Sequence, residues 1–301
     1  MRPLRISAIS YLNTAPLMWD FEHGAAGRDF DISYTLPSAC ARALQSGAAD
    51  IGIIPAAAYA QIPALVVIPG AAIASRRPVR SILLVSRVPL DKIRTVALDT
   101  SSMTSVALTK ILFEKWLGAG RTFTPMAPDI DNMLAAHDAA LIIGDPALQI
   151  DRSRYLTLDL AEEWIRYTGK PFVFAFWAVR QQALQEDILC GDSPLSASRS
   201  DAPGPAQNLA TVFQQSRDHG LEASSLAQIV REWAPRLGLA EKDVYSYLTE
   251  NIYYYLDRSC LEGLQLFYRY AAETGALPAA PEIHLLPAHA LVATPNPVPA
   301  L

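Results

Sequence analysis

The sequence predicts an α/β protein with two domains and a ligand cleft between them. Over the first two thirds of its 301 residues, short apolar runs alternate with helical patterns, which is typical of parallel α/β sheets. Hydrophobic residues make up 51% and charged residues 18%, a balance that favours a folded protein with a large core. A compact α/β segment also lies between the apolar runs 81–86 and 172–179, as expected where a chain leaves one domain, builds a second and returns.

The order of these elements sets the expected domain boundaries. Residues 1–86 and 178–301 are expected to form the larger domain, and residues 87–177 the smaller, inserted one. Two chain crossings would act as a hinge, and ligand sites often lie at such interfaces. The expected strands are 4–9, 31–36, 50–54, 81–86, 95–98, 139–143 and 172–179. The expected helices are one that begins near residue 16 and those at 39–46, 105–117, 206–220, 225–237, 241–248 and 260–274, with 191–207 as a surface loop.

Composition and motifs exclude several classes of function. A net charge of −5 provides no basic surface for a nucleic acid partner. The five histidines form no HxH or HExxH pattern and the three cysteines no CxxC pair, so neither a metal site nor a disulfide framework is expected. Glycine-rich nucleotide motifs are missing. The apolar runs suit neither a membrane span nor a secretion signal, so we expect a cytoplasmic protein without a membrane partner.

Three strand-to-helix turns, at 9–16, 98–105 and 143–148, carry the polar residues that could bind a ligand. The second has five hydroxyl residues within positions 100–105, just before an expected helix. Free N–H groups at a helix N-terminus attract anions, and hydroxyls add donors whose direction can adapt to a carboxylate. In an open parallel sheet such turns gather at the carboxyl ends of the strands, where ligands bind. The turns therefore predict a carboxylate cradle, with ordinary helix capping as the alternative.

Single residues in these turns allow two interpretations each. Asn13 is either a functional amide or a helix cap. Asp145 is either a general base or a cap before Pro146, while Gly144 allows a ligand to approach the backbone closely. Local pattern alone does not decide between these roles.

At this point the sequence resembles the chorismate dehydratase family of the futalosine route to menaquinone. The resemblance runs in order from about residue 4 to residue 275 and rests on the set of matching segments rather than on any one of them. These segments are 10–17, 50–55, 85–90, 102–105, 138–148 and 164–177. The family resemblance implies a periplasmic-binding-protein-like fold of type II, with two α/β domains, a hinge of two chain crossings and an interdomain cleft.

The resemblance also implies a reaction. Chorismate, the expected small-molecule partner, loses water to give 3-[(1-carboxyvinyl)oxy]benzoate, so the protein is expected to be a carbon-oxygen lyase that needs no cofactor. Carried over onto this sequence, the catalytic residue is Asn13, which orients the substrate while the enolpyruvyl carboxylate of chorismate takes the proton. The implied substrate-binding residues are Ser10, Ile54, Ser86, Ser102, Thr104, Ser105, Gly144 and Asp145. One position departs from the family, which often has Arg where this chain has Met103.

Two alternatives to the dehydratase remain at this stage. The sister enzyme 1,4-dihydroxy-6-naphthoate synthase usually has a His-Glu pair where this chain has Gly144 and Asp145, which favours the dehydratase. The second alternative is a non-catalytic cytoplasmic protein that binds a small carboxylate in the same cleft. The oligomeric state is open between a monomer and a homodimer.

Overall fold

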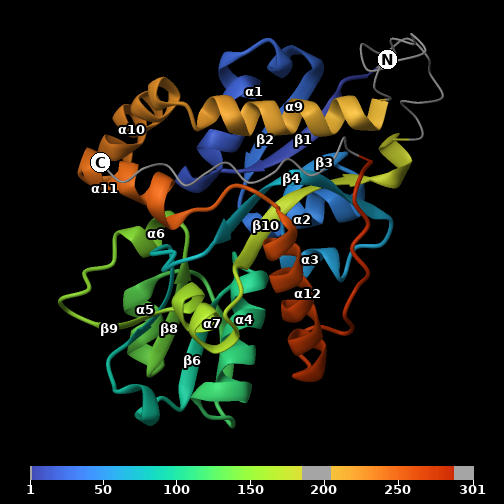
Figure 1. Ribbon diagram of the computed structural model, residues 1–301. Coiled ribbons are helices and arrows are strands. Elements are labelled where there is room, and N and C mark those ends of the chain that lie inside the picture. Colours follow the sequence, from blue (N-terminus) through green and yellow to red (C-terminus); the bar gives the residue numbers. More distant parts are fainter. Residues whose placement is uncertain (1, 185–204, 288–301) are drawn as a thin grey trace.

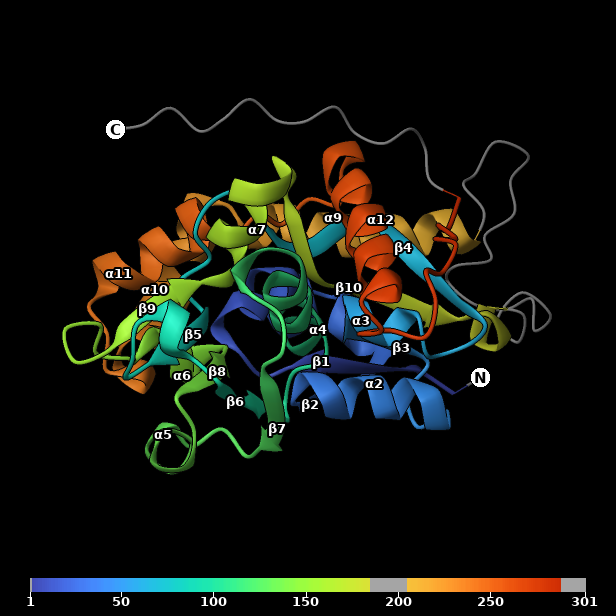
Figure 2. The same cartoon turned by 90° about the horizontal axis from the view of Figure 1, so that it is seen from below.

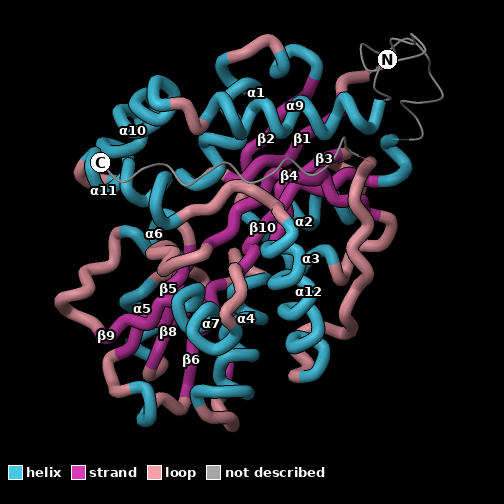
Figure 3. Tube along the Cα trace, in the orientation of Figure 1, coloured by secondary structure: helices cyan, strands magenta, loops and turns pink. Residues whose placement is uncertain are grey.

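The computed structural model describes residues 2–184 and 205–287, so most of the expected loop at 191–207 lies outside the described residues. Its strands form two five-stranded sheets, visible as two magenta groups in Figure 3. The first sheet has the order β2-β1-β3-β10-β4, with β1 (Leu4–Ile9), β2 (Phe30–Thr35), β3 (Ile51–Pro55), β4 (Leu65–Ser75) and β10 (Phe172–Arg180). The second has the order β7-β6-β8-β5-β9, with β5 (Ile82–Ser86), β6 (Thr95–Asp99), β7 (Thr122–Met126), β8 (Ala139–Ile143) and β9 (Leu156–Asp159).

Helices cover both sheets (Figure 1). Those before residue 100 are η1 (Leu12–Met18), α1 (Trp19–His23), η2 (Ala26–Asp29), α2 (Pro37–Ser46), α3 (Ala56–Tyr59) and η3 (Leu90–Lys92). Those of the second sheet are α4 (Thr104–Leu112), η4 (Phe113–Leu117), α5 (Ile130–Ala136), α6 (Asp145–Leu148) and α7 (Leu160–Thr168). The C-terminal third adds α9 (Pro205–Gly220), α10 (Ala223–Leu237), α11 (Glu241–Ser246), η6 (Tyr247–Asn251) and α12 (Arg258–Glu273).

Local sequence explains where these helices begin and end. Pro37 occupies the start of α2, where its missing N–H costs nothing, and Gly47 ends the helix with a φ of 74° that favours glycine. At α7 the Asp159 carboxylate accepts the backbone N–H groups of Ala161 and Glu162, which satisfies two of the donors left free at a helix start. The expected helical residues 39–46 and 105–117 are thus confirmed, the latter as α4 followed by the π-helix η4.

Both sheets are mixed, whereas the strand–helix alternation predicted parallel ones. β10 runs antiparallel to β3 and β4, and β5 runs antiparallel to β8 and β9. Because β10 is buried along almost its whole length between two neighbours, it has the continuous apolar sequence that also occurs in parallel strands. Apolar content alone therefore did not reveal strand direction.

The crossings lie at other points than the sequence predicted. Strand β5, assigned to the larger domain up to residue 86, belongs to the second sheet, and all of β10 from residue 172 belongs to the first. The chain therefore crosses between the sheets in the segments 76–81 and 169–171. Helix α4 lies at this junction, because it contacts α3, α12 and β10 as well as β8 of the second sheet (Figure 2).

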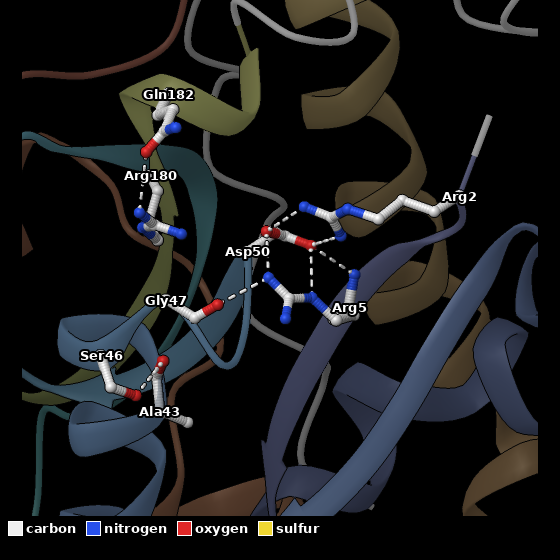
Figure 4. A network of polar contacts seen from close by, with 8 residues as sticks. All are labelled: Arg2, Arg5, Ala43, Ser46, Gly47, Asp50, Arg180 and Gln182. Carbon is white, nitrogen blue, oxygen red and sulfur yellow. Dashed lines mark hydrogen bonds and ion pairs between the residues drawn. The ribbon is translucent and has the colours of Figure 1, made fainter.

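An ion-pair network fixes the start of β1 to the loop before β3. The carboxylate of Asp50, almost fully buried, accepts hydrogen bonds from the guanidinium groups of Arg2 and Arg5 and from the Arg5 backbone N–H (Figure 4). Arg5 also donates to the carbonyl of Gly47. Burial raises the pKa of Asp50, but these hydrogen bonds outweigh it and hold that pKa well below its usual range.

Within the described ranges, no helix is long and apolar enough to cross a membrane, and no cluster of three potential metal ligands occurs. Cys40 and Cys260 are buried free thiols, and Cys190 lies outside the described residues.

Candidate active site between the two sheets

A small cavity of about 50 Å³ lies where the two sheets meet. Its polar lining residues are Tyr11, Asn13, Ser81, Ser102, Thr104 and Ser105. Its other lining residues are Ile9, Pro37, Pro55, Ile73, Val79, Ile82, Ile143, Gly144, Phe174 and Ala175. None of them is basic, so an anion here would be held by backbone N–H groups and hydroxyls.

The N-terminus of α4 supplies three of the polar lining residues. The Ser102 hydroxyl oxygen accepts the Ser105 backbone N–H at 3.1 Å, which stabilises the first turn of the helix. Thr104 is used differently: its hydroxyl donates to the Phe174 carbonyl at 3.0 Å and accepts the Ala57 N–H at 3.1 Å. The Thr104 hydroxyl therefore joins α4 to the first sheet, and the serines remain the candidates for ligand contact.

The turn after β1 carries Asn13 on the short helix η1. Leu12 precedes it, and the Leu12 N–H belongs to the first helical turn, which has no acceptor within the helix. The Asn13 side chain lies near Tyr247, which comes from the C-terminal third of the chain: burial raises the pKa of that tyrosine, and Ser81 and Asn13 oppose the rise. Residues far apart in the sequence thus lie beside Asn13 at the cavity.

The turn after β8 closes against this first turn. Gly144 has a φ of 66°, and a Cβ atom at this position would come within 2.5 Å of the Tyr11 ring, so only glycine allows this approach. Next to it, the Asp145 carboxylate accepts the Leu12 N–H at 3.1 Å and 3.3 Å. Burial raises the pKa of Asp145 to about 6, against the lowering effect of the Leu12 N–H.

Asp99 connects the second and third turns. This buried carboxylate ends β6 and accepts the backbone N–H and the hydroxyl of Ser101 at 2.8 Å and 2.6 Å, and the Ile143 N–H at 3.3 Å. Burial raises the pKa of Asp99, and the Ser101 hydrogen bonds oppose that rise. All three turns therefore meet around the cavity through direct side-chain contacts.

The predicted site residues divide into two groups. Those that line the cavity are Asn13, Ser102, Thr104, Ser105 and Gly144. Those that do not are Ser10, Ile54, Ser86 and Asp145. Ser10 is exposed, Ile54 is fully buried within β3, and Asp145 lies directly behind Gly144. Met103, where the resembled family often has Arg, is partly buried against the core and does not line the cavity.

Ser86 lies at the far end of β5, away from this cavity. Its hydroxyl donates to the carbonyls of Val88 at 2.7 Å and Asp138 at 3.1 Å. Since β5 runs antiparallel to β8, its amino end lies beside Ile143, and Ser81 rather than Ser86 lines the cavity. Sequence reasoning missed Ser81 and Tyr11 as cavity residues, although Ser81 directly precedes the apolar run 82–86 and Tyr11 lies in the turn after the run 4–9.

The comparisons with known proteins agree with this geometry. The periplasmic aliphatic sulphonate binding protein SsuA of Escherichia coli superposes with a TM-score of 0.61 at 16% identity, covering 93% of this chain and 95% of that one. A protein of Archaeoglobus fulgidus superposes with a TM-score of 0.64 at 15% identity, covering 91% and 98%. Two mixed sheets with a cavity between them thus define a periplasmic-binding-protein-like fold, as the sequence predicted.

Sequence comparison identifies the family. A family model described as menaquinone biosynthesis matches residues 4–273, and the chain belongs to this family. Among curated proteins, the chorismate dehydratase of Thermus thermophilus is 28% identical over 299 residues, covering 93% of this chain and 98% of its own length.

Proposed function

We propose that this protein is a chorismate dehydratase, a lyase that converts chorismate to 3-[(1-carboxyvinyl)oxy]benzoate. Membership of the menaquinone biosynthesis family and the name of the Thermus thermophilus relative support the proposal. The observation that carries it is the meeting of Asn13 with the N-terminal turn of α4 in one cavity without basic residues. An amide and an anion-binding turn suit a substrate with two carboxylates and a hydroxyl that leaves.

The dehydration requires few functional groups from the protein. Loss of the ring hydroxyl and of the proton on the neighbouring ether-bearing carbon makes the ring aromatic, and no oxidant or reductant enters the balance. The protein has to orient the substrate, support the leaving hydroxyl and assist departure of the proton. In this proposal Ser102, Ser105 and the first N–H groups of α4 hold one carboxylate.

Asn13 is assigned the catalytic role. Its amide orients the enolpyruvyl carboxylate of the substrate, which takes the proton, beside the leaving hydroxyl. Asp145 is not placed to act as the base, because its carboxylate accepts the Leu12 N–H and does not line the cavity. Asp145 therefore supports the turn that carries Asn13 instead of acting as the base.

Substrate entry requires the two sheets to move apart. Fifty cubic ångströms has room for only a few water molecules, whereas small-molecule pockets usually span about 300–1,000 Å³. The contacts between the turns would open for chorismate and form again around it, which excludes water from the reaction.

The test is direct conversion of chorismate. Purified protein, treated with a chelator, is mixed with chorismate, and the products are separated and weighed by mass spectrometry. We expect loss of one water in the wild type, abolition in Asn13→Ala, and a KM raised about tenfold in Ser105→Ala. Ser86→Ala is the matched control, because it removes a hydroxyl outside the cavity and leaves turnover within about twofold.

Two results would contradict the proposal. Binding of chorismate without turnover would favour the non-catalytic carboxylate-binding protein. Full turnover in Asn13→Ala would remove Asn13 from the catalytic role.

A further inference from the structure

The hydroxyl of Tyr247 bonds to a residue of the cavity wall, although Tyr247 does not line the cavity. Its side chain is about 1% exposed, and its hydroxyl donates to the Ser81 hydroxyl oxygen at 2.9 Å. Burial raises the pKa of Tyr247, and Ser81 and the nearby Asn13 side chain oppose that rise. Tyr247 thus bonds to Ser81, the residue directly before β5, close to Asn13 of the first turn.

The direction of this bond determines what Ser81 can do. When Tyr247 donates to the Ser81 oxygen, the proton of Ser81 is directed to another acceptor. The backbone of Ser81 is also fixed, because its carbonyl accepts the Gly144 N–H at 2.8 Å. With its oxygen and its backbone both held, Ser81 presents a donor to the cavity that it lines.

A second tyrosine in the same segment shows that burial alone does not explain this contact. Tyr254 is about 2% exposed, and its hydroxyl has no hydrogen-bond partner among the described residues. Of these two buried hydroxyls, that of Tyr254 has no partner among the described residues, whereas that of Tyr247 donates to the cavity residue Ser81. Tyr247 also begins the π-helix η6, a local irregularity that often marks a functional site.

We propose that Tyr247 is a positioning residue for the dehydration, whose hydroxyl orients Ser81 and Asn13 around the leaving hydroxyl of the substrate. This inference rests on the proposed function. It extends the site to a third part of the chain, since Tyr247 belongs to neither turn and to neither sheet. Tyr247 acts through its two partners, so its loss weakens transition-state stabilisation more than substrate binding.

The experiment is a double-mutant cycle measured by chorismate turnover. Tyr247→Phe removes only the hydroxyl, Ser81→Ala removes its partner, and Tyr254→Phe is the control that removes an equally buried hydroxyl. We expect Tyr247→Phe to lower kcat about tenfold with KM within twofold of the wild type, while Tyr254→Phe leaves both unchanged. Because Tyr247 acts through Ser81, we expect the double variant to lose much less than the product of the two single losses.

Each other outcome overturns one specific statement. If the wild-type protein converts chorismate and the Tyr247→Phe variant has the same kcat, this inference is overturned and the proposed function stands. A loss in Tyr247→Phe that falls on KM alone, or losses that multiply in the double variant, also overturn it. A wild-type protein that does not convert chorismate overturns the proposed function and this inference with it. Melting temperatures of all four variants separate these outcomes from loss of folded protein.

Discussion

The carboxylate of Asp145 accepts the backbone N–H of Leu12 at 3.1 Å, joining residues that lie 133 positions apart. Leu12 begins η1, which follows β1 of the first sheet. Asp145 therefore accepts a free N–H at the start of η1 and does not cap α6, the helix that it begins itself. The ring of Tyr11 lies against Gly144 in the same contact. These two pairs form a docking contact between the first and third turns, and the predictions below concern it, the Thr104 hydroxyl and the Asp50 ion pairs.

Replacement of Asp145 by Asn is expected to change how stability depends on pH. The folded-state pKa of Asp145, about 6, lies above the usual value near 3.9, so the folded protein binds more protons between these values. The contribution of Asp145 to the wild-type free energy of unfolding therefore falls by about 1–3 kcal/mol as the pH rises from 4 through 6, and does not change above pH 6. Asp145→Asn keeps an acceptor for the Leu12 N–H but does not ionise, so its free energy of unfolding does not fall in this way. Urea unfolding of both proteins at pH 4 and pH 8 tests the prediction. The same difference between wild type and variant at both pH values would contradict it.

Gly144→Ala is expected to break the docking contact. The new Cβ would lie 2.5 Å from the Tyr11 ring, at a φ of 66° that side chains disfavour. We expect a loss of about 2–4 kcal/mol in the free energy of unfolding. Gly169→Ala is the matched control, with a φ of 65° and nothing within 4 Å of the added atom, and should cost only about 1 kcal/mol. Equal losses would mean that the ring contact contributes nothing.

The Thr104 hydroxyl is expected to stabilise the junction between α4 and the first sheet. Thr104→Val leaves the Phe174 carbonyl and the Ala57 N–H without their partner in a buried position. The expected loss is about 2–4 kcal/mol, whereas Thr104→Ser keeps the hydroxyl and loses about 1 kcal/mol or less. Chemical denaturation of both variants measures the difference, and a stable Thr104→Val would show that the hydroxyl is dispensable.

Asp50→Asn is expected to weaken the amino-terminal part of the first sheet. Because Arg2 and Arg5 lower the pKa of Asp50, its stabilising effect is complete above about pH 4 and is lost as the pH falls through the lower folded-state value. At pH 7 the variant should lose about 3 kcal/mol, since it leaves two guanidinium groups without their carboxylate. Glu262→Gln, which removes exposed pairs with Lys170 and Arg258, should leave stability nearly unchanged. Equal effects in the two variants would contradict this prediction.

The sequence predicted the overall architecture and the places of the three turns, because both depend on local patterns. Apolar runs located most of the strands but not β4, β7 or β9, and the hydroxyl cluster before α4 contains Ser102 and Ser105, which line the cavity. Strand direction is not local, and it decides which end of β5 meets the cavity. In a parallel sheet the carboxyl end of 82–86 would face the ligand, but β5 is reversed, so the cavity receives Ser81 instead.

The partners of the turns could not be predicted for a related reason. Asp145 before Pro146 has the pattern of a local helix cap, and nothing near it in the sequence points to Leu12. Tyr247 lies within the expected helix 241–248 with no motif around it, and only the folded chain brings it to Ser81. These contacts follow from tertiary packing, which single-sequence patterns do not encode.

The place of β10 in the first sheet has a consequence for how the chain is made. This strand lies between β3 and β4, yet more than ninety residues separate it from β4 in the sequence. During synthesis the facing edges of β3 and β4 have no partner until the ribosome has released residue 180. All strands of the second sheet lie between residues 82 and 159, so this sheet can form before β10 is made. During that time the edges of β3 and β4 that pair with β10 are exposed. The nascent chain is therefore most exposed to aggregation, and most in need of a chaperone, between the completion of β4 and the arrival of β10.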